Sequence, residues 1–315
     1  MRIFVAGATG ALGKQLVPQL VAAGHQVTGM TRSAQKAELL REMGAEPVVA
    51  DALDAEAVGA AVAGAEPDVV INQLTAISDD PDFRKPDKEF AQTNRLRTEG
   101  TDILLSTAVA AGAKRYIAQS FAGWPFELDG PRVKDEEAPL QTDPPKGVVE
   151  MLAAIRHLES AVTGAEGIEG VVLRYGGFYG PNTSLAANPD GSMTKTIRKR
   201  KMPIVGKGTG VWSFIQIADA ASATVAAVEH GEPGIYNVVD DEPAPVSEWL
   251  PVLAETLGAK RPMRVPALIG RIVAGPAAVV MMNDIRGAAN AKAKRELGWQ
   301  PEFTSWRDGF ARGLA

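Results

Sequence analysis

The chain has 315 residues and a mass of 33.2 kDa, with 45% hydrophobic residues, so it can bury a substantial core as one large or two interleaved domains. Its net charge of −5 and its pI near 5.4 argue against a general nucleic-acid binder, which needs a basic face. The lack of cysteine excludes disulfides, thiolate metal sites and a cysteine nucleophile, and with only three well-separated histidines we expect no metal site.

The first thirteen residues, MRIFVAGATGALG, are typical of a buried strand, a glycine turn and the start of a helix. Glycines at positions 7, 10 and 13 let the backbone approach a pyrophosphate, whose charge meets free N–H groups at the helix start. The same spacing recurs at Gly164, Gly167 and Gly170, where it precedes an apolar run instead of following one. Because a second strand follows at Val27–Met30, the first motif predicts a dinucleotide cradle.

The segment after the second strand bears on the choice of cofactor. It reads Thr31-Arg32-Ser33 and contains no acid, whereas an NAD site usually places Asp or Glu there to bind the ribose 2′-hydroxyl. Arginine suits a 2′-phosphate, so we expect Arg32 and Ser33 to favour NADP over NAD. The alternative is a solvated arginine in a loop.

Further strands alternate with helices, which predicts a parallel, doubly wound α/β sheet of the Rossmann type. Asp51 is a candidate to bind the adenine amino group or to cap the next helix, for which Asp54 is the better cap. Ser120 stands at the carboxyl end of a strand, where ligands of such sheets bind. The expected strands are Glu46–Ala50, Asp68–Asn72, Arg115–Ser120 and Val171–Arg174, with one helix over about Asp87 to Ala111.

Several motifs together resemble the extended or atypical branch of the short-chain dehydrogenase/reductase superfamily, whose members include NAD-dependent epimerases and dehydratases. They are GATGALG, TRS, VVADALD, NRLRTEGTDILLSTAVAAGAKRYIAQS, LRYGGFYGP and FIQIADAASA, and the likeness continues to the closing KRELGWQPEFTSWRDGF. The resemblance implies a nucleotide-binding domain over residues 1–174 and an interleaved substrate-binding lobe over residues 175–315, of which 203–240 partly return to the first domain. It also implies a homodimer formed through helices that flank the sheet.

Dinucleotide contacts are expected from the cradle, from the strand ends and from the segment after the sixth strand. The residues are Gly7, Thr9, Gly10, Ala11, Leu12, Gly13, Thr31, Arg32, Ser33, Asp51, Ala52, Leu74, Gly177 and Phe178.

One feature of that superfamily is missing. Its members move a proton with a tyrosine whose pKa is lowered by a lysine four residues later. If Glu159 is the family's common glutamate, Met151 and Ile155 occupy these two places, and none of the four tyrosines in the chain is followed by lysine at that spacing. Methionine and isoleucine cannot transfer a proton. We therefore expect Ser120 and Tyr175 to be the catalytic residues, in contact with the substrate, the alternative being that both hydroxyls are structural.

The substrate side is expected to contain aromatic and apolar lining. The candidates are Phe121, Trp124, Met151, Trp212 and Phe214. A basic run from Lys195 to Lys201 could hold a substrate anion or form a solvated helix end.

The most apolar late stretch is Leu268–Met282, which is interrupted by Arg271 and Pro276 and is too short to span a bilayer. We expect a packed helix there and no membrane partner. Because the chain enters a strand at once, the expected location is the cytoplasm.

Three functions remain open from the sequence. The first is an NADP-dependent oxidoreductase that acts on a small carbonyl or hydroxyl compound, or on a sugar nucleotide, with an unconventional proton donor. The second is a nucleotide-binding sensor or scaffold that has lost catalysis. The third is a non-redox isomerase, lyase or cyclase in the same cleft.

Overall fold

The structure, a computed structural model, describes residues 1–77, 86–123 and 126–315. Its centre is a seven-stranded sheet in the order β12-β7-β5-β4-β1-β2-β3, in which all neighbouring strands are parallel. The strands are β1 (Arg2–Ala6), β2 (Gln26–Thr31), β3 (Glu46–Val49), β4 (Val69–Asn72), β5 (Arg115–Phe121), β7 (Glu169–Tyr175) and β12 (Gly234–Val238). The doubly wound Rossmann-like fold expected from the sequence is therefore confirmed.

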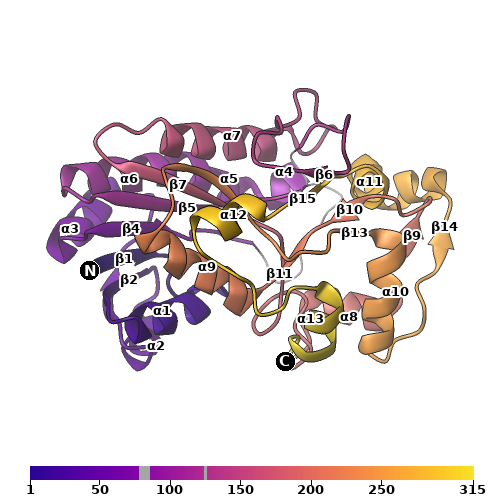
Figure 1. Ribbon diagram of the computed structural model, residues 1–315, viewed down its shortest axis with the longest axis horizontal. Coiled ribbons are helices and arrows are strands. Elements are labelled where there is room, and N and C mark those ends of the chain that lie inside the picture. Colours follow the sequence, from indigo (N-terminus) through magenta and orange to yellow (C-terminus); the bar gives the residue numbers. More distant parts are fainter. Residues whose placement is uncertain (78–85, 124–125) are drawn as a thin grey trace.

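Helices cover both faces of the sheet (Figure 1). Along β1, Ile3 and Val5 face one hydrophobic core while Phe4 and Ala6 face another, because successive side chains of a strand point to opposite faces. The first core includes α1 (Gly13–Ala22), α2 (Ala37–Glu42) and α9 (Ile217–Glu229). The second includes α3 (Ala55–Ala65), α6 (Thr101–Ala110) and α7 (Val149–Thr163).

The helix expected over about 87–111 is divided into four pieces. These are α4 (Pro86–Glu89), α5 (Ala91–Arg95), a π-helical turn (Leu96–Gly100) and α6. Helical residues run without a break from Ala91 to Ala110, so most of the expected range is helical, but a π-helical turn inserts an extra residue and shifts the helical register. Asp87 instead accepts a hydrogen bond from the N–H of Met151 at 3.2 Å, which ties α4 to the first turn of α7.

The rest of the chain builds a smaller lobe around a second, aromatic core that includes Phe214, Trp249, Trp306 and Phe310. Its elements are α8 (Ser192–Arg198), β9 (Ile204–Val205), β10 (Val211–Trp212), β11 (Phe214–Gln216), β13 (Ala244–Pro245), α10 (Val246–Thr256), β14 (Arg264–Val265), α11 (Ala267–Asn283) and α13 (Trp306–Arg312). The short pieces β6 (Val133–Lys134), β8 (Gly177–Tyr179), β15 (Gly287–Ala288) and α12 (Ala291–Glu296) join this lobe to the sheet. Both α9 and β12 lie within 175–315 yet pack into the nucleotide-binding half.

Helix α11 consists of two halves with different surroundings. Gly275, at φ +87°, and Pro276 interrupt the helix, because a left-handed glycine and a residue without an N–H break its hydrogen bonds. The inner half, 277–283, packs against the rest of the protein. The outer half, 267–274, leaves large aliphatic side chains exposed. The expectation of a packed helix is thus correct only for the inner half, and nowhere in the described chain is a helix long and apolar enough to cross a membrane.

Candidate active site

The glycine cradle lies at the carboxyl edge of β1, beside β4, where the strand order reverses and ligands of such sheets bind. Gly7 adopts φ +85°, and a Cβ atom there would lie 2.5 Å from the carbonyl oxygen of Gln73, which follows β4. At Gly13 an added Cβ would lie 2.3 Å from the carbonyl oxygen of Ala8. Both positions therefore require glycine for close backbone packing. Gly10 differs, since it is exposed and an added Cβ would meet only the carbonyl oxygen of Gly7, at 3.2 Å.

The first turn of α1 presents unused backbone donors. Among the described residues, the N–H groups of Thr9, Ala11 and Leu12 have no hydrogen-bond acceptor, and neither a side-chain cap nor an acid lies in this turn. Free N–H groups and the positive end of the helix dipole bind anions. A dinucleotide pyrophosphate therefore fits the cradle.

The predicted 2′-phosphate segment lies next to this cradle. The hydroxyls of Thr9 and Thr31 are 3.4 Å apart, and the N–H of Ser33 donates to Thr31 Oγ1 at 3.3 Å. Arg32 is exposed. These contacts place Arg32 and Ser33 at the same edge of the sheet as the glycines.

The remaining predicted dinucleotide contacts follow β3, β4 and β7. Asp51 is exposed and accepts from the N–H of Leu53, while Asp54 caps α3 through the N–H of Ala57, as expected. Ala52 is buried, and the N–H of Leu74 donates to Asn72 Oδ1. Gly177 and Phe178 lie on β8, directly after β7. The structure therefore brings all the predicted cofactor segments to one edge.

Ser120 does not face an open cleft. Its side chain is buried, and its hydroxyl donates to Glu159 Oε1 at 2.7 Å. Glu159 in turn forms a buried, bidentate ion pair with Arg174, with N···O distances of 2.8 and 2.6 Å. A second cation, Arg97, lies near Glu159; one of its guanidinium nitrogens is buried without a partner, and burial lowers its pKa to about 10. The Ser120 hydroxyl thus belongs to a buried network that joins β5, α7 and β7.

Tyr175 is also buried. Its hydroxyl lies 2.7 Å from Thr224 Oγ1 on α9 and accepts from Gln73 at 3.4 Å. Burial raises the pKa of this phenol, and its hydrogen bonds with Thr224 and Gln73 offset only part of that rise. The arrangement gives Tyr175, like Ser120, a structural position instead of the substrate contact expected from the sequence.

The places that the resemblance assigns to the catalytic tyrosine and lysine are apolar in the structure. Met151 and Ile155 are 8% and 1% exposed. They belong to a group of apolar residues, here called the apolar cluster, in which the inner half of α11 lies against α7. The cluster consists of Val148, Met151, Ile155 and Ala277, with Phe90, Phe121, Leu140 and Met281 packed against it.

A small hollow of about 40 Å³ adjoins the apolar cluster at the ends of β5 and β7. Its polar side chains are already engaged: the Trp212 indole donates to the carbonyl of Met281, and the Ser213 hydroxyl bonds the backbone of Ala288. The lining is Phe121, Ala122, Gly123, Gly177, Trp212, Ser213, Met281 and Ile285. Among the described residues, this lining offers no free acid or base.

Three predicted substrate residues, Phe121, Met151 and Trp212, lie in the hollow or the apolar cluster. Phe214 does not, because it is fully buried in the aromatic core of the small lobe, so that prediction needs correction. Trp124 lies outside the described residues. The sequence did not indicate Ala277, Met281 or Ile285, although the glycine and proline inside the late apolar stretch were a visible sign of its division.

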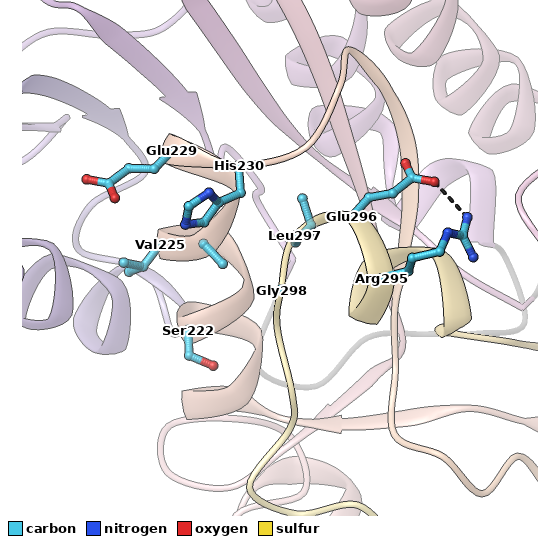
Figure 2. A pocket seen from close by; sticks show the side chains of 9 residues that line it. Ser222, Val225, Glu229, His230, Arg295, Glu296, Leu297 and Gly298 are labelled. Atoms are coloured by element: carbon cyan, nitrogen blue, oxygen red, sulfur yellow. Dashed lines mark hydrogen bonds and ion pairs between the residues drawn. The ribbon is translucent and has the colours of Figure 1, made fainter.

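A second cavity, of about 490 Å³, lies elsewhere, between the C-terminal end of α9 and α12 (Figure 2). Figure 2 shows His230 and Glu229 on one side and Arg295, paired with Glu296, on the other. This end of α9 leads to the amino end of β12, whereas the cradle lies at the carboxyl edge of the sheet. Within the described parts of the chain, no group of three or more acidic or histidine side chains could hold a metal ion.

Fold, cradle and strand-end loops together define a dinucleotide-binding enzyme of the Rossmann class. The chain belongs to the NAD dependent epimerase/dehydratase family, which it matches over residues 3–238. It is thus an enzyme of oxidoreductase or epimerase/dehydratase type.

Similar proteins include a 3-diazoavenalumate denitrifying reductase from a Streptomyces species, with 46% identity over 99% of this chain and 100% of the relative. A ketoreductase from Stigmatella aurantiaca, which acts on a farnesylated dihydroquinoline oxide, is 29% identical over 82% of this chain and 74% of its own length. Among solved structures, UDP-glucose 4-epimerase of Thermotoga maritima has a TM-score of 0.76 at 22% identity, covering 100% of this chain and 97% of the other. That likeness concerns the fold.

Proposed function

We propose that the protein is an NADPH-dependent reductase that removes the diazo group of a small organic compound and puts hydrogen in its place. The observation that carries the proposal is the apolar cluster, because Met151 and Ile155 are buried there, at the places where the family resemblance would put a proton donor and its lysine. The reaction named for the 46% identical relative supplies the class of substrate.

Loss of dinitrogen from a diazonium compound needs no proton donor. When bound, the reduced nicotinamide supplies a hydride that forms a C–H bond at a diazonium carbon, while the C–N bond breaks and dinitrogen leaves without uptake of a proton. Reduction of a ketone differs, since the oxygen must gain a proton as the hydride arrives. The chain's own apolar residues exclude water from the reacting carbon, and Met281, with its flexible thioether side chain, can adapt to the substrate.

The cradle residues would bind the phosphates of the cofactor. The N–H groups of Thr9, Ala11 and Leu12 would bind the pyrophosphate, and Arg32 and Ser33 would bind a 2′-phosphate. The absence of an acid after β2 supports NADPH over NADH.

Cofactor preference is tested by titrating the protein with NADPH and NADH in parallel. We expect NADPH to bind at least tenfold more tightly, and the Arg32→Asp variant to reverse that order because the carboxylate repels a 2′-phosphate. Arg41→Gln, which changes an exposed cation on α2, is the matched control and should behave as wild type. Equal affinities for the two cofactors in the wild-type protein would refute the preference.

The reaction is tested with a ¹⁵N-labelled ortho-hydroxyaryl diazonium salt and NADPH deuterated at C4, against a protein-free control. We expect labelled dinitrogen to form above the uncatalysed rate, and deuterium to appear on the carbon that carried the diazo group. Gly13→Ala, which obstructs the cradle, should abolish both signals. Turnover of a ketone panel without dinitrogen release would favour carbonyl reduction, the second candidate that the ketoreductase relative supports.

A further inference from the structure

The outer half of α11 exposes a row of aliphatic side chains. Leu268, Ile269, Ile272 and Val273 are 71%, 49%, 78% and 69% exposed. They recur at helical spacing on one side, while Gly270 faces the protein so closely that a Cβ there would lie 2.3 Å from a methyl carbon of Val205 on β9. Exposed apolar side chains gathered on one helix face mark an interaction surface.

Lysine and arginine are concentrated in two segments of the chain, one of which contains this row. The segments 191–218 and 257–283 contain ten lysines and arginines and no acid, in a chain whose net charge is −5. All ten are exposed. They are Lys195, Arg198, Lys199, Arg200, Lys201, Lys207, Lys260, Arg261, Arg264 and Arg271.

The fold brings the two segments together. Strands β9 and β14 pair in parallel, with Ile204 opposite Arg264, and the Arg200 side chain donates to the carbonyl of Arg261 at 2.9 Å. Figure 1 shows β9, β14 and α11 side by side at one end of the molecule. Among the ion pairs of the described chain, only Arg198, with Asp190, engages one of these cations. We call the ten cations and the four aliphatic residues the basic-apolar face.

We propose that the basic-apolar face attaches the protein peripherally to an anionic lipid bilayer. Negative headgroups attract the clustered cations, and the aliphatic row of α11 enters the boundary between headgroups and acyl chains. A bilayer suits these residues better than a protein groove, since the side chains project into solvent and need no shaped partner. This proposal revises the expectation of no membrane partner, which rested on the lack of a spanning segment. It needs no spanning segment, because the helix would lie on the membrane surface.

The experiment is co-sedimentation of the full chain with vesicles of mixed phosphatidylglycerol and phosphatidylcholine, and with vesicles of phosphatidylcholine alone. We expect binding only to the anionic vesicles and a steep loss of binding in high salt. Arg264→Gln with Arg271→Gln should weaken binding by about tenfold or more, since each cation contributes roughly fivefold at an anionic surface. Ile272→Ser with Val273→Ser should weaken it by at least tenfold.

Control variants use residues of the same kind on other surfaces. Val149→Ser, at the exposed start of α7, and Arg41→Gln should bind vesicles as wild type does. Because every changed residue is exposed, thermal unfolding should confirm that all variants fold.

Three results would overturn the proposal. The first is equal binding to both kinds of vesicle, or no binding to either. The second is binding to polyglutamate without binding to vesicles, which would identify an acidic protein as the partner. The third is a wild-type protein that is a dimer and does not bind vesicles, together with an Ile272→Ser, Val273→Ser variant that is a monomer. That result would identify a second copy of the chain as the partner.

Discussion

The two ends of the candidate active site differ in character. At the cradle, glycines and the free N–H groups of Thr9, Ala11 and Leu12 leave polar donors for an anion. At the reacting end, Met151 and Ile155 lie in the apolar cluster under α11, and the polar groups of the hollow are engaged. The groups that can bind an anion and the apolar lining thus come from separate residues, so either end can change while the other is kept.

The variant expected to perturb the apolar end most is Ile155→Lys, which puts a lysine where the family resemblance would place one. We expect it to lower the free energy of unfolding by about 4 kcal/mol or more, since an unpaired ammonium is buried. This loss of stability should become smaller as pH rises, because the new lysine keeps its proton in the unfolded chain and loses it in the folded one. Ile155→Leu should cost less than about 1.5 kcal/mol. Urea unfolding measures both, and similar stabilities would show that the site tolerates charge.

The cradle is tested by Gly13→Ala, whose added methyl meets the backbone of Ala8. We expect NADPH affinity to fall at least a hundredfold and unfolding to become easier by about 1–3 kcal/mol. In Gly64→Ala, on the exposed side of α3, the methyl meets nothing within 4 Å, so this control should gain about 0.5–1 kcal/mol. Unchanged NADPH binding by Gly13→Ala would contradict a cradle at this position.

A pH experiment separates stability from chemistry. Burial raises the pKa of Asp240, at the end of β12, to about 8. Between pH 4 and pH 8 the folded protein therefore holds a proton that the unfolded chain has lost, so stability should fall with rising pH, by at most about 1.4 kcal/mol per pH unit. Asp240→Asn should flatten this slope, whereas Glu166→Gln, on an exposed turn, should not.

The turnover number should vary little over the same pH range, because no acid or base lines the hollow among the residues that the structure describes. A bell-shaped profile that disappears in Asp240→Asn would instead assign proton transfer to that carboxyl group.

The smallest effects are expected from the two buried hydroxyls. Ser120→Ala and Tyr175→Phe each remove a hydrogen-bonding group inside the protein, at a cost of about 1 kcal/mol in unfolding free energy. The turnover number should stay within about twofold of wild type. A tenfold loss, with an unchanged melting temperature, would instead restore the catalytic role expected from the sequence.

Local patterns predicted much of this molecule. The apolar runs of β1 and β2, the cradle between them and the Asp54 cap depend on neighbouring residues, so the sequence alone indicated them. The surroundings of Ser120 and Phe214 depend on partners far along the chain, which periodicity does not reveal. The same limit concealed the apolar cluster, since its two sides, α7 and α11, are more than a hundred residues apart.

The interruption of α11 at Gly275 and Pro276 has a practical consequence. The inner half lies in the apolar cluster and lines the hollow through Met281. The outer half packs on β9 at Gly270 and exposes its large aliphatic side chains. The four exposed aliphatic residues of the outer half can therefore be changed for solubility or for tethering to a support without altering the lining of the hollow. Within this one helix, the exposed side chains of the outer half can be changed, whereas those of the inner half must be kept.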